Sequence, residues 1–291
     1  MQRSIDHLVV AVADLDQARR NWKDLGFTVT PVARDPFGTA NALVQLDGIF
    51  IELLAIADLP SIPEAAVGAF SFAAFNRDFL AKREGASMLA LKSADAAADR
   101  DEFEKRGLPT FSTADYSRKA RGPDGVDREV SFSLSFTREP RLRDVGFFTC
   151  QHHRPENFWH PEFQKHANGA CRLDSVVLVT RDPADFHAFF THFTGQHDMS
   201  STSLGVTFDV GQGKIEIMSP IGYNAWYGDL SEPDPRRLLA CRIVVDDLSR
   251  TRQSFDADGI AYAERMGALV VPPSAANGVA LAFAEAGAVQ D

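Results

Sequence analysis

Hydrophobic and polar positions follow one order along this chain, and the order occurs four times. Each copy begins with a short apolar run typical of a strand. A polar capping residue and apolar positions at helical spacing follow, and a glycine ends the helix. The cap and glycine pairs are Asp14 with Gly26, Asp95 with Gly107, Asp182 with Gly195, and Asp247 with Gly259. Their spacing is 12 residues in three copies and 13 in the other, which indicates an internal repeat.

Strand-like segments follow the predicted helices. In the first copy, residues 41–46 and 49–54 flank Asp47-Gly48, a pair typical of a two-residue hairpin turn. Each copy is therefore expected to be a strand, a helix and about three more strands. The pattern predicts an α+β chain of four βαβββ modules. The four helices are expected near residues 15–25, 95–106, 183–194 and 248–258.

Three segments interrupt this regular series. Residues 56–86 are mixed and rich in Phe, and we expect an excursion or a short helix packed on the core. Residues 152–170 are rich in His and Pro, so we place a domain boundary there, between residues 1–168 and 169–291. Residues 115–128 are polar and are interpreted as an exposed loop.

Composition narrows the classes of partner. The formal net charge of -10 repels phosphate backbones, so nucleic acid is not an expected partner. Three widely spaced Cys form neither a disulfide framework nor a CxxC metal site, which fits a reducing compartment. The sequence shows neither an export signal nor a long apolar run, so we expect a cytoplasmic protein without a membrane partner.

The first copy carries a group of short motifs. They are Ile5-Asp6-His7-Leu8-Val9-Val10, Asp14-Leu15, Leu25-Gly26-Phe27, Gly38-Thr39-Ala40-Asn41 and Ile51-Glu52-Leu53-Leu54. Together they resemble the glyoxalase-like domain family of the vicinal oxygen chelate superfamily. The resemblance implies that modules pair into two cups of strands, and that such a cup often holds a divalent metal. Four copies also resemble the two-domain arrangement of extradiol dioxygenases. Pairing within one chain and pairing across a homodimer both stay open.

The family's metal ligands lie on the first and last strands of a module, where this chain has His7 and Glu52. Because side chains alternate along a strand, we expect His7 on the face of Ile5 and Val9, and Glu52 on the face of Phe50. The alternative without a site is that His7 is a hydrogen-bonded core histidine and that Glu52 is a surface carboxylate. An imidazole with a carboxylate suits Fe, Mn, Zn or Ni.

A metal site needs at least a third ligand. The second module has Met88 at the matching first-strand position, which departs from the pattern. His152, or Gln151, could supply the ligand from the end of that module. The segment 151–160 either folds over the cup or is a solvated linker. The candidate substrate-binding residues are Asn41, His153 and Trp159.

The C-terminal pair of modules lacks the expected histidines. The repeat register places Ser175 and Ala240 where the first module has His7. Spacing from the cap chooses Glu285 as the match of Glu52, whereas counting from the Asn-Gly turn chooses Ala282. We therefore expect no metal in this half, which would be structural or a lid.

Two functions remain for a cup that binds a small organic molecule. The first is a divalent-metal-dependent lyase, isomerase or dioxygenase, in which Glu52 is a metal ligand or a general base. The second is a metal-free binding or sequestering protein of the bleomycin-resistance type. Met88 and the 22 Phe of the chain favour this second reading.

Overall fold

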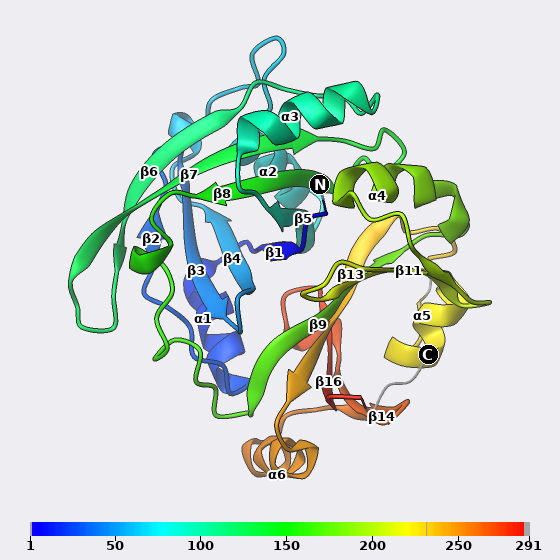
Figure 1. Ribbon diagram of the computed structural model, residues 1–291. Coiled ribbons are helices and arrows are strands. Elements are labelled where there is room, and N and C mark those ends of the chain that lie inside the picture. The colour runs from blue at the N-terminus through cyan, green and yellow to red at the C-terminus, as the bar shows by residue number, and fades with distance from the viewer. Residues whose placement is uncertain (1, 231, 288–291) are drawn as a thin grey trace.

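Two eight-stranded mixed sheets with accompanying helices make up the fold (Figure 1), as seen in a computed structural model that describes residues 2–230 and 232–287. The first sheet has the order β2-β3-β4-β1-β5-β8-β7-β6, and the second has the order β10-β11-β12-β9-β13-β16-β15-β14. Adding eight to each strand number of the first order gives the second, so the two sheets have the same topology. The four-module α+β fold with two paired cups is therefore confirmed.

The bounds of the elements follow the repeat. The first sheet holds β1 (Ile5–Ala11), β2 (Ala33–Arg34), β3 (Thr39–Gln45), β4 (Phe50–Ile56), β5 (Gly85–Lys92), β6 (Ala114–Arg121), β7 (Asp127–Thr137) and β8 (Gly146–His152). The second holds β9 (Ala170–Val179), β10 (Ser200–Ser201), β11 (Gly205–Asp209), β12 (Lys214–Met218), β13 (Arg237–Val245), β14 (Ala263–Arg265), β15 (Ala268–Val271) and β16 (Ala280–Glu285). The predicted domain boundary falls between these two sets of strands.

The four expected helices are confirmed, and a polar side chain caps three of them. The four are α1 (Leu15–Asp24), α3 (Ala96–Lys105), α4 (His187–Thr194) and α6 (Leu248–Asp258). Two further helices are α2 (Phe72–Leu80) and α5 (Pro220–Tyr227). Short 3₁₀ turns are η1 (Leu59–Ser61), η2 (Pro155–Asn157), η3 (Pro183–Phe186) and η4 (Pro273–Ala275). Asp14, Asp95 and Asp247 accept N–H groups of the first turns of α1, α3 and α6. In the third module η3 precedes α4, and the Asp182 side chain makes no cap bond. No helix within the described ranges has the length and apolar character to cross a membrane.

Strand registers resolve the alignment of the modules. Val9 pairs with Glu52 between β1 and β4, and Val177 pairs with Glu216 between β9 and β12. In the fourth module Ala240 pairs with Ala280, and Arg242 pairs with Ala282. Ala282 is therefore the match of Glu52. Glu285 is exposed, and it accepts the N–H of Leu248 at the start of α6.

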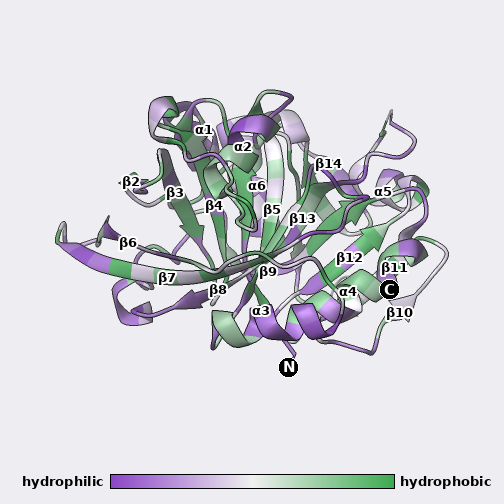
Figure 2. Cartoon of the chain, turned by 90° about the horizontal axis from the view of Figure 1, so that it is seen from above, coloured by the Kyte–Doolittle hydropathy of each residue, from purple (hydrophilic) through white to green (hydrophobic). Residues whose placement is uncertain are grey.

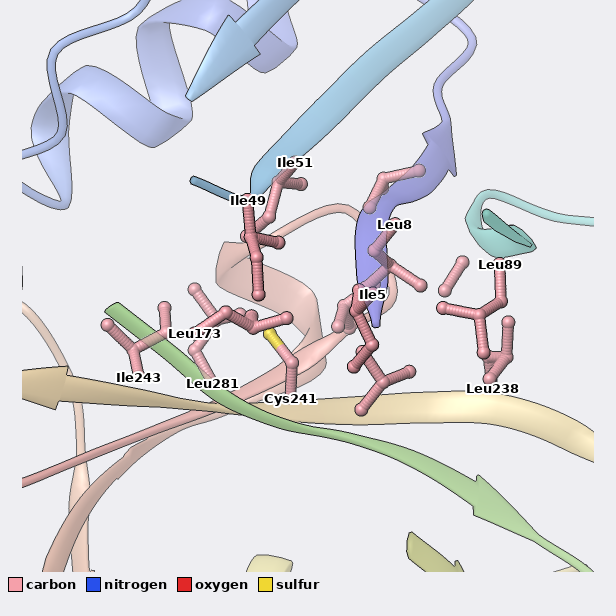
Figure 3. Close-up of a cluster of buried hydrophobic side chains, with 14 of the residues drawn as sticks. Ile5, Leu8, Ile49, Ile51, Leu89, Leu173, Leu238, Cys241, Ile243 and Leu281 are labelled. Atoms are coloured by element: carbon pink, nitrogen blue, oxygen red, sulfur yellow. The ribbon is translucent and has the colours of Figure 1, made fainter. Parts of the chain in front are cut away.

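The two sheets pack back to back through one apolar layer (Figure 3). The first sheet contributes Ile5, Leu8, Ile51 and Leu89, and the second contributes Leu173, Cys241, Ile243 and Leu281. All of these side chains are fully buried. Burial of apolar surface stabilises by about 25 cal/mol per Å², so this layer joins the two halves. The opposite faces of the sheets form the cups.

The segment 115–128 is not a loop, and that expectation is wrong. Its residues belong to the long antiparallel hairpin of β6 and β7, whose far end is hydrophilic (Figure 2). Tyr116, Arg118 and Ala120 alternate with more exposed residues along β6. Arg118 is buried although its neighbours in sequence are polar. The period-2 pattern of a strand was hidden because the inward positions include a charged residue.

A bulge at Asp6 also corrects the expected face of Ile5. Between β1 and β5, Ile5 pairs with Leu91 and His7 pairs with Ala90, so Asp6 is an extra residue. A bulge interrupts the alternation of side chains. Ile5 consequently packs in the layer between the sheets, whereas His7 faces the cup with Val9.

Arg3 joins the start of the chain to the third module. Its backbone N–H donates to the Thr194 carbonyl at 2.8 Å, and its side chain donates to the Phe193 carbonyl at 3.1 Å. The same buried guanidinium bonds Asp99 at 2.8 Å and Glu102 at 2.7 Å on α3. Four bonds therefore hold Arg3 between α3 and α4.

His166 fastens the segment between the sheets to the first module. Its Nδ1 accepts the Thr28 N–H at 3.0 Å, so its Nε2 carries the proton and donates to the Gln45 carbonyl at 2.8 Å. Burial lowers the pKa of His166 below 6.5, against the opposing effect of the Gln45 carbonyl. A neutral ring is thus required by the fold.

We predict that His166 makes stability depend on pH. Because its folded pKa is depressed, its contribution is complete above about pH 6.5 and declines as the pH falls below that value. His166→Ala should lower the free energy of unfolding by about 1 to 3 kcal/mol at pH 7.5, since two hydrogen bonds are lost. Urea unfolding at pH 7.5 and 5.0 should show a smaller difference at pH 5.0. Exposed His197→Ala is the control, and an equal difference at both pH values would contradict the assignment.

Candidate functional site

The N-terminal cup encloses a small cavity of about 20 Å³ between the first two modules. It is lined by His7, Leu43, Phe50, Glu52, Phe72, Tyr116, Arg118, Phe132, Leu134, Phe148, Cys150 and Phe158. This volume holds about one water molecule. Six aromatic side chains surround a few polar ones, so each polar group acts at low dielectric.

Asp6 fixes the orientation of His7. Its Oδ2 lies 2.6 Å from His7 Nδ1 and 3.2 Å from His152 Nε2. Burial opposes ionisation of this carboxyl, but the two imidazoles outweigh it, so the pKa of Asp6 lies well below its usual range. An ionised carboxylate accepts the Nδ1 proton, and the Nε2 of a neutral His7 is then an acceptor. The His7 ring also stacks on Phe50, with centroids 4.3 Å apart.

Glu52 faces the free nitrogen of His7. Its Oε2 lies 3.7 Å from His7 Nε2, while its Oε1 accepts a hydrogen bond of 2.7 Å from Asn41. Burial raises the pKa of Glu52 above 4.5, His7 opposes the shift, and Asp35 reinforces it. Two acceptors cannot bond each other. A proton, a cation or a donor group of a bound molecule is needed between these two atoms.

A second buried ion pair supports Asn41. Arg118 Nε lies 2.9 Å from Asp35 Oδ1, and both side chains are almost fully buried. Asp35 also accepts from Thr39 Oγ1 at 2.8 Å and from Asn41 Nδ2 at 3.3 Å. Burial raises the pKa of Asp35 despite the neighbouring guanidinium. The network therefore runs from Arg118 through Asp35 and Asn41 to Glu52.

Cys150 lies beside this network. Within the described part of the chain, Asp6, His7 and Cys150 bring one potential ligand atom each within 4.8 Å of one another. Burial, together with the nearby Asp6 and Glu52 carboxylates, raises the pKa of the Cys150 thiol well above its usual value. A protonated thiol is a poor ligand and a poor nucleophile, so this trio holds a metal less readily than His7 with Glu52.

The segment that follows β8 closes the cup. Phe158 is buried against Phe50 and Phe132, with ring centroids 5.0 Å and 5.9 Å away. Gln45 holds the segment in place, since its Nε2 donates to the Phe158 carbonyl at 2.7 Å and its Oε1 accepts the His160 N–H at 3.2 Å. Residues 153–163 are called the cover segment below.

The structure brings some predicted site residues together and separates others. Glu52 and Asn41 meet at the cup, as described, and Trp159 packs partly buried against it. His152 has Asp6 as its partner, and its role as a metal ligand stays a prediction. His153 is exposed and its Nε2 lies 2.7 Å from Ser133 Oγ, outside the residues that line the cavity.

Sequence reasoning missed Asp6, Asp35, Gln45 and Arg118. Asp6 was given no role there, and its place beside His7 depends on the bulge in β1. Arg118 was placed in a loop. A charged residue inside an otherwise apolar strand, as at Asp6, is the signal that points to a buried polar partner.

A family model described as a glyoxalase-like domain matches residues 5–194. No curated protein matches the sequence. A hypothetical protein from Staphylococcus aureus superposes with a TM-score of 0.66 at 11% identity, over 97% of this chain and 99% of that chain.

Two enzymes share the fold at low identity. A mutant of 4-hydroxymandelate synthase from Streptomyces coelicolor has a TM-score of 0.57 and 9% identity, over 97% of this chain and 92% of that chain. The 2,2',3-trihydroxybiphenyl 1,2-dioxygenase from Sphingomonas wittichii strain RW1 has a TM-score of 0.52 and 15% identity, over 97% and 91%. At these identities the likeness establishes the fold alone.

We predict that Arg118 is needed mainly to neutralise Asp35. Arg118→Met leaves a buried carboxylate without its cation, which should cost about 3 to 5 kcal/mol of unfolding free energy. The double variant Asp35→Asn with Arg118→Met removes both charges and should recover most of that loss. Chemical denaturation at pH 7 measures both. Equal instability of the single and double variants would contradict the pairing.

Proposed function

This chain belongs to the glyoxalase-like domain family, and on that premise we propose that it is an enzyme that moves a proton on a small carbonyl compound in its N-terminal cup. The observation that carries the proposal is the pair of facing acceptors, His7 Nε2 and Glu52 Oε2, 3.7 Å apart. Asp6 and Asn41 hold them from behind. Such fixed, buried acid–base pairs are typical of catalytic sites.

The reaction class is isomerisation or elimination. Glu52, as carboxylate, takes the proton from a carbon next to a carbonyl, and the C–H electron pair moves into the carbonyl to give an enolate. Burial raises the pKa of the Tyr116 phenol well above 10, so it stays neutral and can donate to the enolate oxygen. The proton then returns to carbon, or a leaving group departs. Arg118 adds positive potential on the same wall.

The residues also fit a divalent ion. His7 Nε2 and Glu52 Oε2 are two facing donors of the types that Fe, Mn, Zn or Ni accept, and Asp6 orients the imidazole as outer carboxylates do in metal sites. When bound, such an ion supplies Lewis acidity toward a substrate oxygen. His152 is the proposed further ligand, after release from Asp6. The ion is proposed as a cofactor of the same site.

Substrate entry requires the cover segment to move. A second cavity of about 20 Å³ adjoins the first and shares Leu43, Arg118 and Phe158 with it. Displacement of the Phe158 ring would join the two spaces. Opening must break the bonds of Gln45 to the Phe158 carbonyl and the His160 N–H, and also the 2.9 Å bond from Asn157 to the Glu129 carbonyl. We infer a substrate small enough to lie beneath Phe158.

A metal-free binding protein is the second candidate. The aromatic rings around His7 favour it, because they offer stacking surface to a flat apolar or cationic molecule. In that case Glu52 would neutralise a cation of the ligand. Turnover and metal content separate this candidate from the enzyme.

We predict that the protein binds about one divalent ion through His7 and Glu52. Protein purified without chelators or a His-tag should contain the ion by elemental analysis. At about 100 times the dissociation constant, the ion should add about 2.7 kcal/mol to stability. His7→Ala and Glu52→Gln should lose both effects, while His153→Ala should keep them. Full metal content in His7→Ala would contradict the ligand assignment.

We predict that Glu52 sets the pH dependence of proton transfer. Incorporation of solvent deuterium into dihydroxyacetone, followed by NMR, should fall at least about 100-fold in Glu52→Gln. In the native protein the rate should rise with pH as Glu52 ionises, with a midpoint above 4.5 because burial raises its pKa. Glu285→Gln, at an exposed carboxylate, is the control. Undiminished exchange in Glu52→Gln would exclude Glu52 as the base.

A further inference from the structure

The C-terminal cup contains a larger cavity than the N-terminal one. Its volume is about 180 Å³, and it lies between β11, β12, α5 and the turn from β14 to β15. Its apolar wall is formed by Leu204, Val206, Met218, Trp226 and Met266. An engineered cavity of about 150 Å³ in another protein binds benzene, so this one has room for a ring with a small substituent.

One ion pair forms the polar wall of this cavity. Arg242 and Glu216 line it and are 4% and 6% exposed. Arg242 Nη1 lies 3.0 Å from Glu216 Oε1 and 3.3 Å from Asp174 Oδ2, and its guanidinium lies over the Trp226 ring at 4.5 Å. Both Glu216 oxygens are held by the guanidinium, since Oε2 also accepts from Arg242 Nη2 at 3.3 Å, whereas Arg242 Nε finds no hydrogen-bond partner among the described residues. One buried donor therefore stands unpaired beside a buried ion pair.

The turn at the mouth of the cavity is locally unfavourable. Met266 and Gly267 connect β14 to β15, and Met266 has φ of 48°. Asn or Gly is the usual residue there, because a left-handed conformation costs an ordinary side chain about 1 kcal/mol or more. The Met266 side chain lines the cavity and is 53% exposed. The apolar Met266 side chain therefore lies at the opening of the cavity although its backbone conformation destabilises the turn.

We propose that this cavity is a second small-molecule site, which takes a compact neutral molecule with a ring-sized apolar body and one carboxamide group. The carboxamide oxygen accepts from Arg242 and its N–H donates to Glu216, so one neutral group is complementary to both charges of the pair. A carboxylate ligand would face Glu216 and an ammonium ligand would face Arg242, so each is disfavoured. The site is separate from His7 and Glu52 and does not depend on the function proposed for them.

Benzamide, benzoate and benzylamine are matched probes, since they share a ring and differ in charge. Binding is followed by NMR through the indole N–H signal of Trp226, which Trp226→Phe identifies. Benzamide should bind with a dissociation constant on the order of a millimolar or tighter, and the two charged probes at least about tenfold more weakly. Absence of binding, or equal binding of all three probes, would overturn the proposal.

Two variants locate the site. Leu204→Phe fills the cavity and should weaken benzamide binding at least about tenfold, whereas Leu59→Phe at an exposed position should not. Glu216→Gln leaves Asp174 to neutralise Arg242, so benzoate should bind this variant at least about tenfold more tightly than the native chain. His7→Ala should leave benzamide binding unchanged. Unweakened binding to Leu204→Phe, or unimproved benzoate binding to Glu216→Gln, would refute the assignment.

Discussion

The apolar layer between the two sheets determines where the polar side chains of the central strands can lie. Strands β1 and β9 run through its centre and must present apolar side chains to it. A buried polar group there without a partner would cost several kcal/mol. Polar chemistry is therefore confined to the opposite faces, which is why each half of the molecule has a cup with a charged wall inside an apolar rim.

The bulge in β1 follows from the same constraint. With regular alternation, Asp6 and His7 would point to opposite faces, and one of them would enter the apolar layer. The extra residue lets both serve the cup, while Ile5 and Leu8 fill the layer. In the second half, the buried polar residue on the cup face is Arg242, whose guanidinium forms ion pairs with Glu216 and Asp174. Equal scaffolds thus hold an imidazole in one cup and a guanidinium in the other.

Much of the fold could be predicted from the sequence, because helix caps, terminal glycines and hairpin turns are local signals. The same residues could not predict the site fully. The pairing of His7 with Glu52 follows from strand register, whereas Asp6 depends on a bulge that no residue type announces. Arg118 depends on a hairpin whose inward position is charged, and Asp35 depends on Arg118 for its neutralisation. Local pattern can indicate a buried charge such as Asp6, but it does not identify the distant residue that pairs with it.

The position of Arg3 bears on how the chain is made. Its partners reach as far as Thr194, almost two hundred residues later. At about 5 to 20 residues per second, a ribosome needs about 10 to 40 seconds to synthesise that stretch. Once α3 has been synthesised, Arg3 can bond Asp99 and Glu102, but the Phe193 and Thr194 carbonyl groups are still missing. The N-terminal half therefore gains the last two bonds of Arg3 only when the third module has been synthesised, which couples the assembly of the two halves.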